Sequence, residues 1–172
     1  VERALRRLRR LSEAEQAMGK EFSQAEIQRV LDEVHRAPDV QPTRTVDPAS
    51  LHGKRILVID DEEILREMAV DMLAAIGCEA HAEANGRDGV GYYREHWQEL
   101  DAVILDMIMP HMAGRDAFLT IREINPDARV VLASGFSAGG GAKELLEQGA
   151  AGFLQKPFQQ SELIEKLVEA IG

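Results

Sequence analysis

The sequence predicts an α/β protein with a doubly wound, five-stranded parallel sheet and an N-terminal helical extension. Short apolar runs alternate with amphipathic helical patterns five times between residue 54 and residue 172. The strongest runs are apolar throughout, as expected of strands that are covered on both faces. Parallel strands joined by right-handed helical crossovers form an open sheet, and such sheets bind ligands beyond the carboxyl ends of their strands.

Three strands are predicted from continuous apolar runs bounded by charge, and two from weaker patterns. They are Arg55–Ile59, Ala102–Leu105 and Arg129–Ala133, then Cys78–Glu83 and Ala151–Leu154. Helical periodicity fills the intervals, and several helices are closed by Gly or Asn. The expected helices are Glu63–Ile76, Arg87–Trp97, Gly114–Ile124, Ala142–Gln148 and Ser161–Ile171.

The first 36 residues are predicted to form two amphipathic helices, and residues 37–53 a linker to the domain at 54–172. Apolar residues recur at three- and four-residue spacing from Val1, and Ser23 to Glu26 has the pattern of a capping box for the second helix. The linker is rich in proline and polar residues. Two such short helices cannot bury their apolar faces alone, so we expect a homodimer through residues 1–36 in preference to docking on the same chain.

Composition and charge restrict the class of protein. The chain has 172 residues, of which 45% are hydrophobic and 29% charged, and its single cysteine, Cys78, excludes an intrachain disulfide or a Cys-rich metal site. Lys and Arg balance Asp and Glu in residues 1–50, so the net charge of −10 lies entirely in residues 51–172. An acidic domain argues against nucleic-acid binding. Without a membrane span or an apolar signal core, we expect a cytoplasmic protein.

Carboxylates, a hydroxyl and an ammonium follow the predicted strands. Asp60 and Asp61 follow the first strand, Asp106 the third, Ser134 the fourth and Lys156 the fifth. Each pair of ionised carboxylates about 4 Å apart costs roughly 4 kcal/mol at an effective dielectric near 20, so a proton or a cation must be present. Oxygen ligands without His or Cys favour Mg²⁺. A metal beside a lysine suits phosphoryl transfer, in which an Asp can become an aspartyl phosphate.

These residues and their surroundings resemble the receiver domain of two-component response regulators. The motifs are the pair Asp60-Asp61, LDMIMPHMAG around Asp106, LASGF around Ser134 and LQKPF around Lys156. The resemblance covers 54–172 and is greatest to the C-terminal receivers of hybrid histidine kinases. It implies a flavodoxin-like fold with strand order 2-1-3-4-5.

The resemblance also implies roles for individual residues. Asp106 would be the phosphoacceptor, and Asp61 and Asp106 would bind Mg²⁺ directly, with Asp60 acting through water and Ile108 through its backbone carbonyl. Lys156 would pair with Asp106 or its phosphoryl group. Two further residues would take part in the conformational switch: Ser134, by a hydrogen bond to a phosphoryl oxygen, and Phe153, the switch aromatic, which lacks a tyrosine hydroxyl.

The function expected is that of a phosphoacceptor signalling domain, which takes a phosphoryl group from a histidine kinase or a histidine phosphotransfer protein. We expect no enzyme activity beyond its own phosphorylation and dephosphorylation. One alternative is a helical interaction module that carries a passive receiver. A phosphatase of the haloacid-dehalogenase type is disfavoured, because Ile108 stands where that family needs a second Asp. Whether the chain is a stand-alone regulator or the terminal receiver of a hybrid kinase stays open.

Overall fold

The computed structural model describes residues 47–135 and 140–172. The chain divides into two units, residues 1–45 and 46–172. The two helices expected within residues 1–36, and most of the expected linker, lie outside the described residues. The fold reported below is that of the second unit.

The sheet has five parallel strands in the order β2-β1-β3-β4-β5, which confirms the predicted fold class. The strands are β1 (Arg55–Ile59), β2 (Glu79–Glu83), β3 (Ala102–Asp106), β4 (Val130–Ser134) and β5 (Gly152–Gln155). The chain moves outward from β1 in both directions along the sheet. The carboxyl ends of β1 and β3 therefore flank the point where the strand order reverses, which is where such sheets bind ligands.

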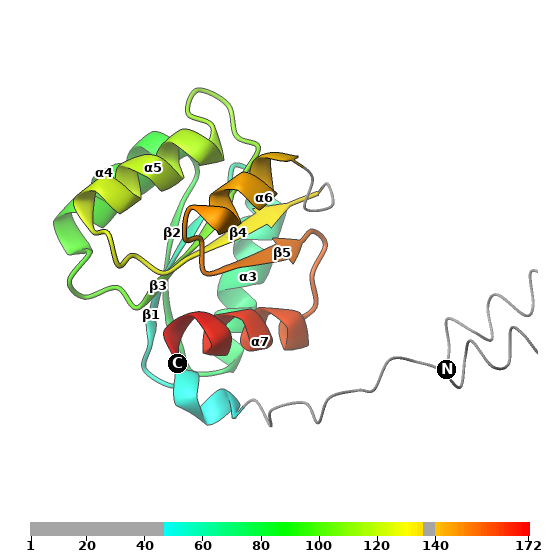
Figure 1. Ribbon diagram of the computed structural model, residues 1–172. Helices are drawn as coiled ribbons and strands as arrows, with labels where there is room; N and C mark the ends of the chain where they lie inside the picture. Colours follow the sequence, from blue (N-terminus) through cyan, green and yellow to red (C-terminus); the bar gives the residue numbers. More distant parts are fainter. Residues whose placement is uncertain (1–46, 136–139) are drawn as a thin grey trace, which may run out of the picture. The chain divides into compact units, whose positions relative to one another are not determined.

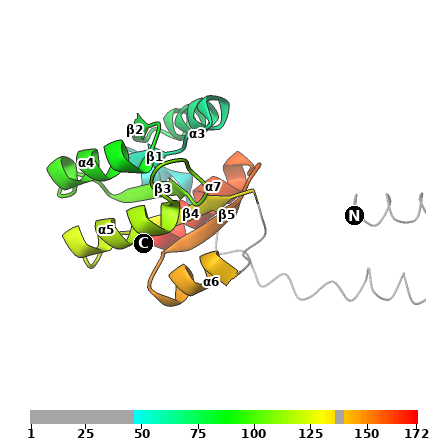
Figure 2. The same cartoon turned by 90° about the horizontal axis from the view of Figure 1, so that it is seen from above.

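Helices cover both faces of the sheet, as Figures 1 and 2 show. They are α3 (Glu63–Ala75), α4 (Gly86–His96), α5 (Gly114–Ile124), α6 (Gly140–Glu147) and α7 (Gln160–Ile171). Buried residues of α4, α5 and α6 share one core cluster, and those of α3 and α7 share the other. The ends agree with the predicted ones to within two residues, the usual uncertainty at helix ends.

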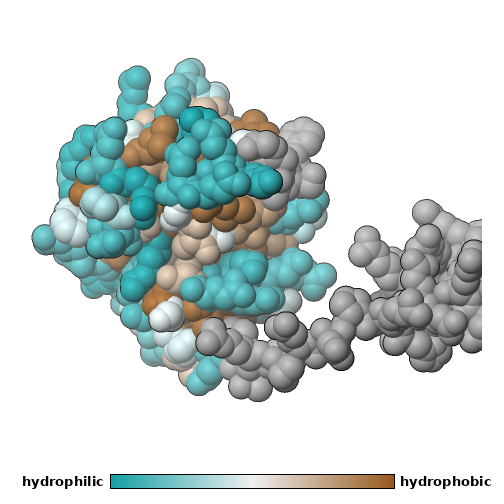
Figure 3. All heavy atoms as spheres, in the orientation of Figure 1, coloured by the Kyte–Doolittle hydropathy of each residue, from teal (hydrophilic) through white to brown (hydrophobic). Residues whose placement is uncertain are grey.

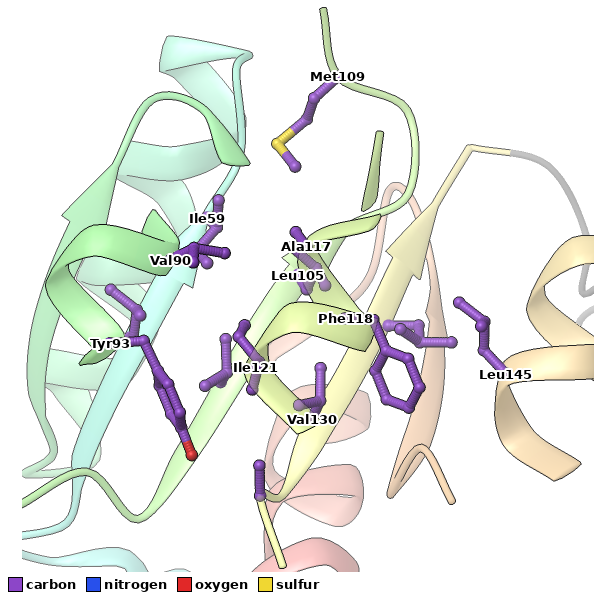
Figure 4. Packing of buried hydrophobic residues seen from close by; sticks show 14 of the residues in the cluster. Ile59, Val90, Tyr93, Leu105, Met109, Ala117, Phe118, Ile121, Val130 and Leu145 are labelled. Carbon is purple, nitrogen blue, oxygen red and sulfur yellow. The ribbon is translucent and has the colours of Figure 1, made fainter. Parts of the chain in front are cut away.

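The two core clusters explain the continuous apolar runs in the sequence. Every residue of β3 and β4 is buried, because each central strand has helices on both of its faces. Figure 4 shows one cluster, in which Val90, Phe118 and Leu145 from three helices pack beside Ile59 and Leu105 of the sheet. β2 lies at the edge and is only partly buried, which explains its weaker pattern.

The last part of the expected linker belongs to the α/β domain. Pro48–Leu51 forms a short 3₁₀ helix, η1, whose first turn is capped by Asp47 through a 3.0 Å hydrogen bond from the Ala49 N–H. Leu51 is 1% exposed and joins the cluster of α3 and α7, and its carbonyl accepts a 3.3 Å hydrogen bond from Cys78 Sγ. The packed domain thus begins before residue 54. A single buried leucine has no periodicity, so pattern analysis could not detect it.

The face of the domain shown in Figure 3 is mostly hydrophilic, with hydrophobic residues showing between the hydrophilic ones. No helix in the part of the chain that the structure describes is long and apolar enough to cross a membrane.

Candidate functional site

The sheet brings four of the predicted side chains to one edge. Asp60 follows β1, Asp106 ends β3, Ser134 ends β4 and Lys156 follows β5. Their exposed fractions are 6%, 3%, 6% and 8%, in that order. Among the described residues, these four are the only buried ones that are charged or carry an aliphatic hydroxyl. Burying such groups costs free energy unless they are paired, so this concentration marks the edge as a functional site.

Lys156 connects two of the carboxylates. Its Nζ atom lies 2.9 Å from Asp106 Oδ2 and 2.7 Å from Asp60 Oδ2, and 3.8 Å from Glu62 Oε1 at the rim. The resemblance implied the contact with Asp106. The contact with Asp60 was not expected, and it places the ammonium between the carboxyl ends of β1 and β3.

Burial and pairing shift the pKa values of this pair. Burial raises the pKa of Asp106, and the ammonium of Lys156 offsets only part of that increase. Burial alone would lower the pKa of Lys156, but Asp60 and Asp106 outweigh it and the pKa of Lys156 is raised. The lysine therefore stays charged, while Asp106 lies in a buried group of carboxylates that is short of positive charge.

The carboxylates form a group that fits a divalent cation. Asp60, Asp61 and Asp106 each offer an oxygen, and the three oxygens lie within 4.8 Å of one another. One ammonium cannot neutralise three carboxylates, and oxygen ligands of this kind suit Mg²⁺. Asp61 is exposed, and its carboxylate has no hydrogen bond or ion pair with any residue that the structure describes. It is therefore free to bind a cation.

The other expected residues lie around this group. The Ile108 N–H donates to Asp106 Oδ1 at 3.2 Å, and its side chain is exposed. The Ser134 carbonyl accepts a 2.8 Å hydrogen bond from the Lys156 N–H, which ties the ends of β4 and β5 together. Phe153 is partly buried in β5 against the cluster of α4, α5 and α6, and it pairs in register with Leu132.

The loop after β3 is held close to α5. A Cβ atom at Gly114 would lie 2.2 Å from the backbone oxygen of Asp106 and 2.6 Å from Met107 Cα, so no side chain fits there. The Gly114 N–H donates to the Met107 carbonyl at 3.3 Å. In the same loop, His111 has a φ of 67°, an uncommon conformation for a residue other than glycine. The position of Asp106 therefore depends on this tight turn.

Two residues near the acidic group were not among the expected site residues. Glu62 lies within ion-pair distance of Lys156, and Arg66 Nη1 donates a 2.8 Å hydrogen bond to the backbone carbonyl of Asp60. A signal for Arg66 was present, because side chains on a helix lean toward its N-terminus. Arg66 stands in the first turns of α3 and so extends back toward the acidic residues.

Comparison with known proteins gives a consistent result. A sequence model described as the response regulator receiver domain matches residues 56–168. Chemotaxis protein CheY of Thermotoga maritima is 38% identical over 116 residues, which are 67% of this chain and 95% of that protein. Sensor kinase CckA of Brucella abortus is 29% identical over 137 residues, which are 78% of this chain and 14% of that protein.

Solved structures agree with the sequence matches. A response regulator receiver domain protein from Clostridium thermocellum superposes with a TM-score of 0.66 at 30% identity, over 69% of this chain and 94% of that one. The receiver domain of a sensor histidine kinase from Pseudomonas aeruginosa superposes with a TM-score of 0.62 at 28% identity. The superposition covers 70% of this chain and 98% of that one. That structure has a magnesium ion coordinated in its active-site cleft.

Proposed function

Because this chain belongs to the response regulator receiver domain family of two-component systems, we propose that it accepts a phosphoryl group on Asp106 from a phosphohistidine. The observation that carries the proposal is the environment of Asp106. Its carboxylate is 3% exposed, lies 2.9 Å from the Lys156 ammonium and belongs to the group of three carboxylates. The Lys156 ammonium and a divalent cation bound by the carboxylates would together offset their negative charge, so that an anionic phosphoryl group could approach the nucleophile.

The transfer is a displacement at phosphorus. A carboxylate oxygen of Asp106 forms the new O–P bond, the P–N bond to the histidine breaks, and the imidazole nitrogen keeps the electron pair. Lys156 remains charged because its pKa is raised, and it pairs with the developing negative charge on the phosphoryl oxygens.

A divalent cation completes the site. Asp61 and Asp106 would bind Mg²⁺ directly, Asp60 through water and Ile108 through its backbone carbonyl, and the ion would supply charge neutralisation at the phosphoryl oxygens. Asp60 is already paired with Lys156, which supports an indirect role for its carboxylate. The exposed Asp61 has no such competing partner among the residues that the structure describes.

Ser134 and Phe153 form the proposed switch. Ser134 would donate to a phosphoryl oxygen, and Phe153 would change its burial in response. Both belong to adjacent strands, β4 and β5, whose ends are tied by the hydrogen bond from Lys156 to Ser134. A displacement at Ser134 is thus passed to β5 through a backbone contact.

The proposed partners are a histidine kinase or a histidine phosphotransfer protein in the cytoplasm. Relatives in chemotaxis and in a sensor kinase are consistent with either a stand-alone regulator or a receiver within a larger kinase. The passive-receiver alternative is disfavoured because the site has the complete set of three carboxylates, hydroxyl and ammonium. A dehalogenase-type phosphatase would need a carboxylate where the exposed side chain of Ile108 lies.

The test is phosphorylation by acetyl phosphate with Mg²⁺, followed by intact mass. The wild-type chain should gain one phosphoryl group, and Asp106→Asn should gain none because the nucleophilic charge is removed. Asp71→Asn is the matched control, since Asp71 is exposed on α3 without a partner among the described residues. Labelling of Asp106→Asn, or labelling that persists after chelation of the metal, would show that the proposal is wrong.

A further inference from the structure

We propose that Arg66 is a positioning residue of the acidic site, which holds the β1–α3 turn in the conformation that lets Asp61 bind the divalent cation. The inference rests on the proposed function, because it assumes that Asp61 is a metal ligand. It assigns a role to a side chain that touches neither the phosphoryl group nor the cation.

The contact that carries the inference joins a helix to the end of a strand. Arg66 Nη1 donates to the backbone oxygen of Asp60 at 2.8 Å, in a partly buried position. The Asp60 N–H donates to the carbonyl of Glu83 at 3.1 Å, and Asp60 Oδ1 accepts from the Glu62 N–H at 3.0 Å. Asp60 is thus held by β2 on one side and by α3 on the other.

The same contact determines the direction of the chain at Asp61. The carbonyl of Asp60 and the N–H of Asp61 belong to one planar peptide unit, so fixing the carbonyl fixes the plane from which Asp61 departs. The Asp61 carboxylate has no partner of its own among the described residues. Glu62, the N-cap of α3, makes no side-chain capping bond to that helix. Besides the Lys156–Asp60 ion pair and the bond from the Arg66 N–H to the Glu62 carbonyl, the turn is held by the Arg66 side chain and by the Glu62 N–H bond.

Arg66 donates to a backbone oxygen and not to a carboxylate, and this difference affects whether a cation can bind. A guanidinium that paired with the carboxylates would compete with the metal ion for their oxygens. Arg66 binds a main-chain carbonyl instead, so it holds the turn without occupying an oxygen of the three-carboxylate group.

A positioning role for Arg66 and a purely electrostatic role predict opposite changes in cation affinity when the side chain is removed. If Arg66 acted only through its positive charge, its removal would leave the site more negative and would tighten cation binding. If it positions Asp61, removal weakens binding, because the supporting partners of metal ligands typically contribute about ten- to a hundredfold in affinity. The sign of the change separates the two roles.

The experiment measures Mn²⁺ affinity by electron paramagnetic resonance, with Mg²⁺ as competitor, in the full chain. Arg66→Met should weaken Mn²⁺ binding about tenfold, whereas the rate of labelling by acetyl phosphate should recover at saturating Mg²⁺. Arg94→Met is the matched control, since Arg94 is exposed on α4 without a partner among the described residues. It should leave the affinity within about twofold of wild type, because exposed charges are screened by salt.

A second variant tests whether any loss of affinity comes from loss of folding. Arg66→Gln, whose shorter side chain cannot reach the carbonyl, should show the same loss of affinity while its circular dichroism stays that of wild type. Equal or tighter Mn²⁺ binding in folded Arg66→Met or Arg66→Gln would overturn the inference. Failure of the proposed function is a separate result, in which the wild-type chain binds no Mn²⁺ or Asp61→Ala binds as well as wild type.

Discussion

At the scale of the residue, Lys156 shows how one side chain makes a crowded acidic site compatible with folding. Its ammonium is 2.7 Å from Asp60 and 2.9 Å from Asp106, and all three residues are buried. Charges buried in this way are stable only as a set, because each loses its hydration on folding. We therefore expect removal of the lysine to affect stability as well as the proposed phosphoryl transfer.

We expect Lys156→Met to lower the free energy of unfolding by about 3–5 kcal/mol without divalent cations, since two carboxylates are left buried without a counter-charge. Mg²⁺ should then raise the melting temperature of the variant by more than it raises that of wild type, because the ion also replaces the missing positive charge. Thermal melts with and without Mg²⁺ measure both effects. Equal stability of the two proteins in the absence of Mg²⁺ would contradict the pairing.

The pKa of Asp101, at the other end of the sheet, is shifted in the opposite direction to that of Asp106. Its Oδ1 is 2.9 Å from Lys54 Nζ, and its Oδ2 accepts a 2.8 Å hydrogen bond from the Arg55 N–H. Burial alone would raise the pKa of Asp101, but these two partners, together with the positive charge of Arg129, outweigh it and the pKa is lowered. The ionised form is therefore favoured in the folded protein.

The lowered pKa of Asp101 determines how its contribution to stability changes with pH. A carboxyl group with a lowered folded pKa contributes stability above its unfolded pKa, near 3.9, and loses it as the pH falls through the folded value. Asp101→Asn should lower the free energy of unfolding by about 1–2 kcal/mol at pH 7, and the difference from wild type should shrink as the pH drops below about 4. Urea unfolding of both proteins across this pH range measures the difference in their free energies of unfolding. A difference that does not change with pH would show that the charge of Asp101 is not its cause.

Among the helices, α5 begins at a glycine, Gly114, that is packed so closely against the preceding loop that no side chain fits there. Gly114 lies against the backbone of Asp106, whereas Gly91 in α4 has nothing within 4 Å of the Cβ position. Both residues are helical, so helix propensity alone would predict that alanine stabilises the protein at either position. The local packing makes the two positions different.

Gly114→Ala should lower the free energy of unfolding by about 1–3 kcal/mol, because the backbone next to Asp106 must shift to accept the methyl group. Gly91→Ala should instead raise it by about 0.5–1 kcal/mol. Chemical denaturation of the two variants measures the difference. Stabilisation by Gly114→Ala would mean that the turn after β3 relaxes at little cost.

At the scale of the whole molecule, the domain boundary can be tested by truncation. Leu51 is buried in the cluster of α3 and α7, so we expect a fragment of residues 47–172 to fold independently. A fragment of residues 54–172 should melt at a lower temperature, because loss of a buried leucine costs about 2–5 kcal/mol. Equal melting temperatures would show that η1 adds nothing to the stability of the domain.

The homodimer expected through residues 1–36 can be tested in the same way. Light scattering at micromolar concentration should give a dimer for the full chain and a monomer for residues 47–172. If the full chain is instead monomeric, and removal of residues 1–46 lowers the melting temperature, the N-terminal segment docks on its own α/β domain.

The apolar runs and the positions of the polar residues after them were enough to predict the parallel α/β architecture and the edge of the sheet at which the site lies. Apolar runs such as Val130–Leu132 are recognisable because strands covered on both faces tolerate almost no polar residue. Asp60, Asp106 and Lys156 could be placed together because the carboxyl ends of parallel strands meet at one edge. The strand order came from the motifs, since periodicity does not say which strands are neighbours.

The pairing and support of these groups became visible only in the packed fold. It placed Lys156 between Asp60 and Asp106, closed the space at Gly114 and directed Arg66 to a main-chain carbonyl. Patterns in a sequence repeat over a few residues and report which face of an element is buried. The distance between side chains that are far apart in the chain is instead set by how the layers pack, so it exists only once the core has formed.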